Sequence, residues 1–104
     1  MTDKELLELA AKAAGMRLNH AGQPTTGNYY DLADFNWNPL LDDGDALRLA
    51  VKLGLEVRTD GPYLIAVTPR YVDNELYEPR GDDPYAATRR AIVRAAAVIG
   101  QEMK

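Results

Sequence analysis

Residues 63–67 form a run that is apolar at nearly every position, and this run limits the fold more than any other segment. It follows the turn residues Asp60 and Gly61, and residues 55–59 before the turn alternate between apolar and polar side chains. The two segments therefore predict an antiparallel hairpin. Because a strand that is apolar on both faces needs cover on both faces, we expect helices on both sides of the sheet.

Two helices carry start signals that act locally. Residues 3–14 follow a capping box, in which the side chains of Thr2 and Glu5 satisfy free N–H groups at the helix start. Residues 84–101 begin with a proline after Asp83, and proline is favoured at the first helical position behind an aspartate N-cap. Both segments are predicted to be helices.

Residues 43–53 form a third predicted helix, which ends before Gly54. Only Asp45, Arg48 and Lys52 form a polar stripe along it, and apolar residues occupy the rest of the circumference. A helix that is apolar around most of its surface is buried on most sides. The sequence therefore predicts that this helix lies mostly inside the protein.

The predicted elements combine into one α+β domain that spans residues 1–104. Segments 16–20 and 29–32 read as two more strands, and the loop between them contains glycine and proline. We expect a mainly antiparallel sheet of about four strands and three helices, in the order α-β-β-α-β-β-α. A further short hairpin is indicated around Asp73 and Asn74.

Composition excludes several chemistries. The chain has no cysteine and no serine, which excludes disulfides, thiolate metal sites and serine nucleophiles. Its glycines are dispersed and form no phosphate-binding loop. A net charge of −4 disfavours nucleic acid as a partner. No secretory signal and no apolar run of about 20 residues is present, so a cytoplasmic location without membrane insertion is expected.

The aspartates at 42–45 and His20 are the candidates for a metal or catalytic site. Asp42, Asp43 and Asp45 lack the spacing of a calcium loop, and their position before a helix predicts capping instead of metal binding. His20 has no serine or cysteine to activate, and a structural place in a strand is favoured over general-base catalysis. The sequence predicts no catalytic residue, no metal site and no cofactor.

Trp37 precedes the turn into the helix at 43–53. It could stack on a ligand, since tryptophan is common at interfaces, but its place before an obligatory turn favours a core anchor. We expect Trp37 to be buried beside that helix.

Two surfaces are candidates for contact with a partner. Arg90 and Arg94 share the outward face of the last helix and could contact phosphate. Pairing with carboxylates is favoured, because no nucleic-acid-recognition motif accompanies them. The second surface contains Tyr29, Tyr30, Asp31 and Asp34, in a stretch without lysine or arginine. An exposed tyrosine among carboxylates suits a basic protein partner, and a loop that covers a sheet edge is the alternative.

Three stretches carry a resemblance: WNPLLDDGDALRLAVKL at 37–53, DDPYAATRRAIVRAAA at 82–97 and ELLELAAKAAG at 5–15. They resemble small proteins encoded by tailed phages and prophages, which are grouped as the phage α-β-α sandwich domain. The resemblance implies an α/β/α sandwich and a bacterium that carries phage genes. It implies no activity and no site residue.

These features favour a non-enzymatic phage or prophage accessory protein that binds another protein of the host or the phage, with interference in a host process as one form. A nucleic-acid-associated regulator that uses Arg90 and Arg94 is the alternative. A small ligand-binding domain or enzyme that uses His20 is a third hypothesis.

Overall fold

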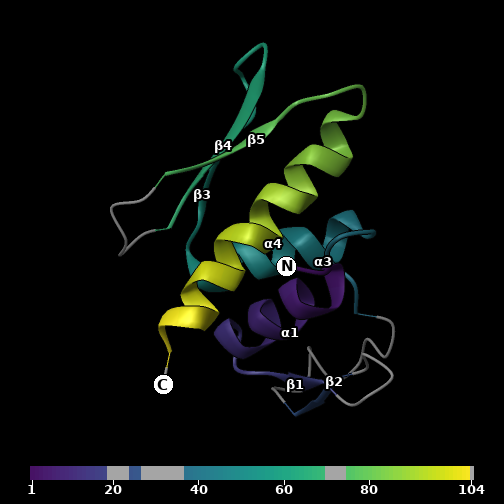
Figure 1. The fold of residues 1–104 in the computed structure, drawn as a ribbon, viewed down its shortest axis with the longest axis vertical. Helices are drawn as coiled ribbons and strands as arrows, with labels where there is room; N and C mark the ends of the chain where they lie inside the picture. The colour runs from purple at the N-terminus through teal and green to yellow at the C-terminus, as the bar shows by residue number, and fades with distance from the viewer. Residues whose placement is uncertain (19–23, 27–36, 70–74, 104) are drawn as a thin grey trace.

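The computed structural model describes residues 1–18, 24–26, 37–69 and 75–103, and places three helices beside two small antiparallel sheets within these ranges (Figure 1). The elements, in chain order, are α1 (Asp3–Ala13), β1 (Arg17–Leu18), β2 (Pro24–Thr26), α3 (Asp43–Leu53), β3 (Glu56–Arg58), β4 (Leu64–Thr68), β5 (Leu76–Pro79) and α4 (Pro84–Glu102).

The helices begin and end where the local signals predict. The Thr2 hydroxyl accepts a hydrogen bond from the Glu5 N–H at 3.1 Å, and the Asp83 carboxylate accepts from the N–H groups of Tyr85 and Ala86. Gly54 ends α3 in the left-handed conformation, with φ of 65°. The N-caps Thr2 and Asp83 are confirmed, whereas the Glu5 carboxylate accepts from the Thr2 hydroxyl at 3.2 Å and not from a free N–H group. No helix in the described ranges is both long and apolar enough to cross a membrane.

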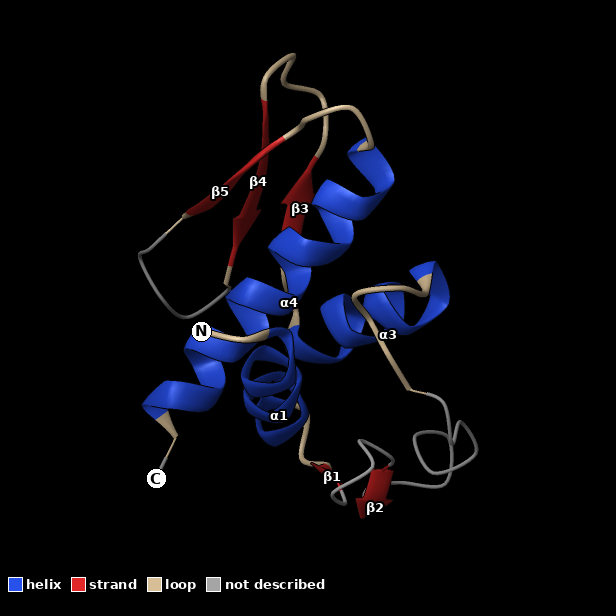
Figure 2. Cartoon of the chain, turned by 45° about the vertical axis from the view of Figure 1, so that its right-hand side comes forward, coloured by secondary structure: helices blue, strands red, loops and turns tan. Residues whose placement is uncertain are grey.

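The larger sheet has the order β3-β4-β5, and both strand pairs are antiparallel. Val67 on the central strand pairs with Val57 on one side and with Leu76 on the other. Val67 and Ile65 are fully buried in the core on the face that α4 crosses (Figure 2). The predicted hairpin before and after Asp60 is therefore confirmed.

The prediction of helices on both sides of the sheet is not met by the described residues. Ala66 points to the second face of β4, where its neighbours in the register are Arg58 and Tyr77. Leu64 and Tyr77 are exposed on this face. Ala66 is only 7% exposed, so among the described residues this face is covered in part and the predicted second helical layer is not confirmed.

The expected four-stranded sheet is not confirmed either. The described residues form five short strands in two separate sheets, and the smaller sheet pairs β1 with β2. β2 falls in a segment that the glycine and proline content predicted to be loop, whereas the strand predicted at 29–32 lies outside the described residues. What is shown is the α+β class, with three helices and a three-stranded antiparallel sheet.

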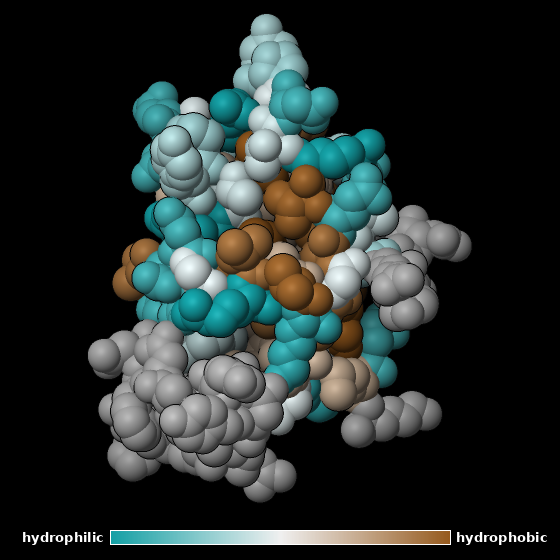
Figure 3. Space-filling model, turned by 180° about the vertical axis from the view of Figure 1, so that it is seen from behind, coloured by the Kyte–Doolittle hydropathy of each residue, from teal (hydrophilic) through white to brown (hydrophobic). Residues whose placement is uncertain are grey.

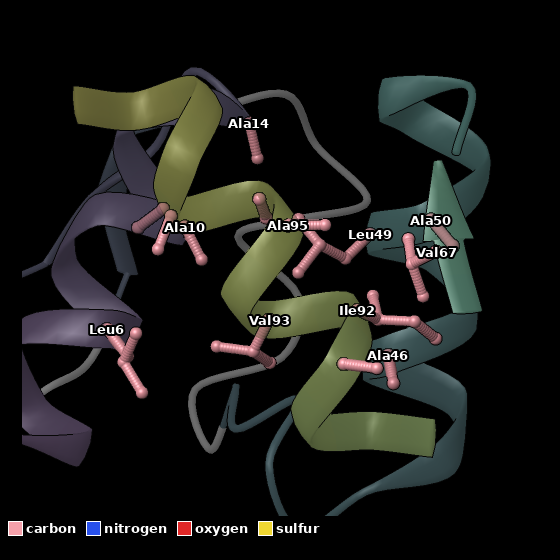
Figure 4. Close-up of a cluster of buried hydrophobic side chains, with 14 of the residues drawn as sticks. Leu6, Ala10, Ala14, Ala46, Leu49, Ala50, Val67, Ile92, Val93 and Ala95 are labelled. Atoms are coloured by element: carbon pink, nitrogen blue, oxygen red, sulfur yellow. The ribbon is translucent and has the colours of Figure 1, made fainter. Parts of the chain in front are cut away.

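The core centres on α4, which lies between α1 on one side and α3 with β4 on the other (Figure 4). α1 meets α4 where both helices carry small buried residues, Ala10 on α1 and Gly100 on α4. Gly100 lies so close to α1 that an added Cβ would stand 2.1 Å from the Leu9 carbonyl oxygen. Trp37 is 8% exposed and belongs to this core, as predicted.

The prediction that α3 is buried on most sides is wrong, although Arg48 and Lys52 of the predicted polar stripe are exposed as expected. Leu47 is 63% exposed and Val51 is 73% exposed, whereas Asp45 of the predicted polar stripe is 1% exposed. α3 packs on the core through Ala46, Leu49 and Ala50, which occupy only one side of the helix. Its remaining apolar residues therefore lie at the surface.

Candidate functional site

An open groove of about 440 Å³ runs between α3 and the N-terminal half of α4, with the edge strand β3 beside it. We call it the α3 groove. Its floor consists of Ala46 and Ala50 from α3, Ile92 from α4 and Val57 from β3. Figure 4 shows Ile92 pointing toward Ala46 across the space between the two helices. All four residues of the floor have apolar side chains.

The sequence forms this groove because small residues recur one helical turn apart. Ala46 and Ala50 stand at positions i and i+4 of α3, so they share one face of the helix. Leu47 and Val51 are also spaced by four and form the adjacent ridge. A row of alanines next to a row of larger side chains leaves a valley along the helix.

The rim of the α3 groove is both apolar and exposed. Leu47 and Tyr85 line the groove from its two walls, and Tyr85 is 71% exposed. Val51, one turn beyond Leu47, continues the exposed ridge outside the groove. Figure 3 shows apolar side chains gathered in the middle of the face on which α3 lies, with hydrophilic residues around them. Apolar patches rimmed by polar residues mark interaction sites on many proteins.

Charged groups also line the α3 groove. Arg89 donates from Nη1 to the Asp43 carboxylate at 2.6 Å and from Nε to the Leu40 carbonyl oxygen at 2.9 Å. Arg80 donates from Nη1 to the carbonyl oxygens of Thr59 and Gly61. The groove thus combines an apolar floor with one ion pair and one cation held by main-chain carbonyls.

The aspartates at the start of α3 are engaged in protein contacts. Asp42 accepts from the Asp45 N–H at 2.8 Å, which confirms it as the N-cap. The Asp45 carboxylate accepts from the Asn38 N–H at 2.9 Å and from Arg48 at 2.5 Å. Within the described ranges, no group of three acidic or histidine side chains is placed to hold a metal ion.

The arginines predicted as phosphate contacts lie against β5. Arg94 forms an ion pair with Glu78, and Arg90 pairs with Asp3 at 3.2 Å and with Glu78 at 3.8 Å. The pairing with carboxylates that the sequence favoured is therefore present. Neither arginine lines the α3 groove.

The other residues singled out from the sequence lie outside the described residues. These are His20, Tyr29, Tyr30, Asp31 and Asp34. The surface predicted from them stays a prediction.

Sequence reasoning missed Leu47, Val51 and Tyr85 as surface residues. The sequence contained one signal of this exposure. A surface helix needs a single apolar stripe to pack on its core, and α3 has apolar residues beyond that stripe. Excess apolar residues on a helix indicate either deep burial or an interface, and the pattern itself does not distinguish them.

No family model matches this chain, and neither the curated proteins nor the solved structures contain a match.

Proposed function

We propose that this chain is a non-enzymatic protein-binding domain whose contact surface is the α3 groove with its exposed ridge, Leu47 and Val51. The observation that carries the proposal is the exposure of these two side chains beside an apolar groove. Exposed single apolar residues are normal, but here two stand on one ridge and an exposed tyrosine stands across an apolar groove from it.

The energetics support a contact surface. Burying one leucine or valine side chain contributes about 1.5–3 kcal/mol, so covering the ridge and Tyr85 supplies several kcal/mol of favourable transfer free energy. Tyr85 adds a phenol that can donate a hydrogen bond at the edge of a contact, and tyrosines are enriched among residues that dominate binding. A partner that covers this area has enough apolar surface to offset part of the cost of association.

The alternatives gain less support from the same residues. A nucleic-acid regulator that uses Arg90 and Arg94 would need both side chains to leave Glu78, in a chain whose net charge is −4. An enzyme in the α3 groove would have to work with Asp43, Arg80, Arg89, Tyr85 and two threonines. Thr88, one of these, already donates its hydroxyl to the Pro84 carbonyl oxygen at 2.7 Å.

The resemblance to phage-encoded sandwich domains supplies a setting for this proposal. In that setting the chain is a phage or prophage accessory protein in the cytoplasm of a bacterial host, and its partner is a protein of the host or the phage. The proposal keeps the surface at Tyr29, Tyr30, Asp31 and Asp34 as a second contact. Interference with a host process is one form of action that the proposal allows.

The proposal is tested by charge substitution on the ridge. Leu47→Asp and Val51→Asp place a carboxylate on exposed positions, so both variants should keep their far-ultraviolet circular dichroism spectrum. Leu64→Asp is the matched control, because Leu64 is also exposed but lies on the open face of the sheet.

The readout is recovery of partner proteins from a lysate of the bacterium that carries the gene. We expect a protein band that the wild type and Leu64→Asp recover and that both ridge variants lose. Equal recovery by all four folded proteins would contradict the proposed surface.

A further inference from the structure

Arg80 differs from the other arginines whose side chains the structure describes. Five of these six form ion pairs with carboxylates: Arg48, Arg58, Arg89, Arg90 and Arg94. Arg80 instead donates to the carbonyl oxygens of Thr59 at 2.8 Å and Gly61 at 3.2 Å, and it has no carboxylate partner in the described part of the chain. With 16 acidic residues against 12 lysines and arginines, such an arginine is the exception in this protein.

The two carbonyl contacts orient the Arg80 guanidinium. Both are made by Nη1, so the N–H groups of Nε and Nη2 have no partner among the described residues. The Nε and Nη2 edge of a guanidinium matches the two oxygens of a carboxylate in a bidentate hydrogen bond. Because Arg80 is already held in place, little side-chain freedom is lost when a carboxylate binds.

The charges of the α3 groove favour an acidic occupant. Two arginines and one aspartate line it, and the aspartate, Asp43, is paired with Arg89. The remaining cation, Arg80, belongs to a chain that is acidic overall. A partner that brings one carboxylate to the groove therefore complements its charge, whereas a basic segment would meet an uncompensated arginine.

The shape of the groove favours a helix. Ala46 and Ala50 form a valley along α3, and Leu47 and Val51 form the ridge beside it. Helices pack by setting a ridge of side chains into such a valley. An amphipathic helix presents apolar side chains at positions i, i+3 or i+4, and i+7, which is the pattern that a helix-binding groove accepts.

We infer that the α3 groove binds an amphipathic helix of a partner protein, whose apolar face covers the Leu47 ridge and whose glutamate or aspartate side chain pairs with Arg80. The inference rests on the proposed function, since it names the partner chemistry of the same surface. A bidentate pair between arginine and carboxylate should change the affinity by about 10-fold to 100-fold.

The test is selection from a displayed library of helical peptides of about 15 residues, a length at which isolated helices become stable enough to bind. The positions at helical spacing are apolar, and the flanking positions vary among glutamate, glutamine, lysine and alanine. The full chain is immobilised as wild type, Leu47→Asp, Arg80→Gln and Arg58→Gln. Arg58→Gln is the matched control, because Arg58 pairs with Glu75 on the open face of the sheet.

We expect the wild type and Arg58→Gln to enrich peptides with glutamate at one fixed flanking position. Replacing that glutamate by glutamine in a synthetic peptide should weaken binding to the wild type about 10-fold or more. This comparison of two peptides uses the wild-type protein, so it tests the pairing even if Arg80→Gln does not fold. Binding to folded Arg80→Gln should show no preference between the two peptides.

The other outcomes separate the two proposals. Peptides that lose binding to Leu47→Asp but show no preference for glutamate would overturn the role of Arg80. The same result would support the α3 groove as a protein-binding site. Enriched peptides that bind Leu47→Asp equally well, or no enrichment at all, would overturn both. A dimer in sedimentation velocity that Leu47→Asp dissociates would show that a second copy of this chain occupies the groove, which also overturns the inference.

Discussion

Replacement of Gly100 by alanine tests how closely α1 and α4 must approach. Gly100 is buried in the last turns of α4, opposite Leu9 of α1. A Cβ at this position would stand 2.1 Å from the Leu9 carbonyl oxygen and 2.8 Å from its carbonyl carbon. Both atoms belong to the main chain, so no rotamer change can relieve the overlap, and the two helices must move apart.

The expected loss of stability follows from two opposing effects. Overpacking a close-packed core costs about 1–3 kcal/mol, and an overlap with the main chain belongs at the upper end of this range. Alanine is favoured over glycine inside a helix by about 1 kcal/mol, which offsets part of that cost. The net change in the free energy of unfolding should therefore be a loss of about 2 kcal/mol, or roughly 8 °C in Tm for a domain of this size.

The assay is urea unfolding followed by circular dichroism, together with thermal unfolding. Gly44→Ala is the matched control, because Gly44 is also helical but its added Cβ would meet only the ends of the Arg48 and Asp42 side chains at 3.2 Å. These side chains need to move by only a few tenths of an ångström, although Asp42 is the N-cap and Arg48 pairs with Asp45, so the control should change by no more than about 1 kcal/mol in either direction. A Gly100→Ala protein as stable as the wild type would refute the packing argument.

Three further outcomes are expected. Trp37→Ala should lower the free energy of unfolding by about 3–5 kcal/mol, because a large buried aromatic is removed from the core, and tryptophan emission typical of full water exposure in the native protein would contradict this. Asp45→Ala should cost about 2 kcal/mol in urea unfolding, because the Asn38 N–H loses a charged acceptor, and an unchanged midpoint would argue against that contact. Addition of a chelator should leave the Tm unchanged, because Asp42, Asp43 and Asp45 already have protein partners, and a large fall would show that the capping interpretation is wrong.

The helices could be predicted because their signals lie within one or two turns of each end. Thr2, Asp42 and Asp83 each accept N–H groups of the first turn, as their positions before helical patterns indicate. Gly54 ends α3 because its left-handed conformation suits glycine. These interactions need no contact with distant parts of the chain, and the sequence alone was enough to place them.

The candidate site could not be predicted because exposure depends on elements far apart in the sequence. Ala46 and Leu47 are neighbours in an apolar segment, yet only the packing of α3 on α4 decides that Ala46 is buried and Leu47 is exposed. Arg80 gives no local signal either, since its carbonyl partners, Thr59 and Gly61, lie about 20 residues before it.

The sequence by itself therefore determined the local elements: the capped helices, the hairpin of β3 and β4, and the burial of Trp37. Only the tertiary structure shows that α4 covers one face of the sheet and, among the described residues, which side of α3 is exposed. The physical reason is that an apolar side chain is stabilised by leaving water, whatever element buries it. Which element packs against it depends on how the whole chain is packed. In this protein the packing leaves Leu47 and Val51 exposed on α3, with Leu47 lining the same groove as Arg80, and the proposed function depends on these residues.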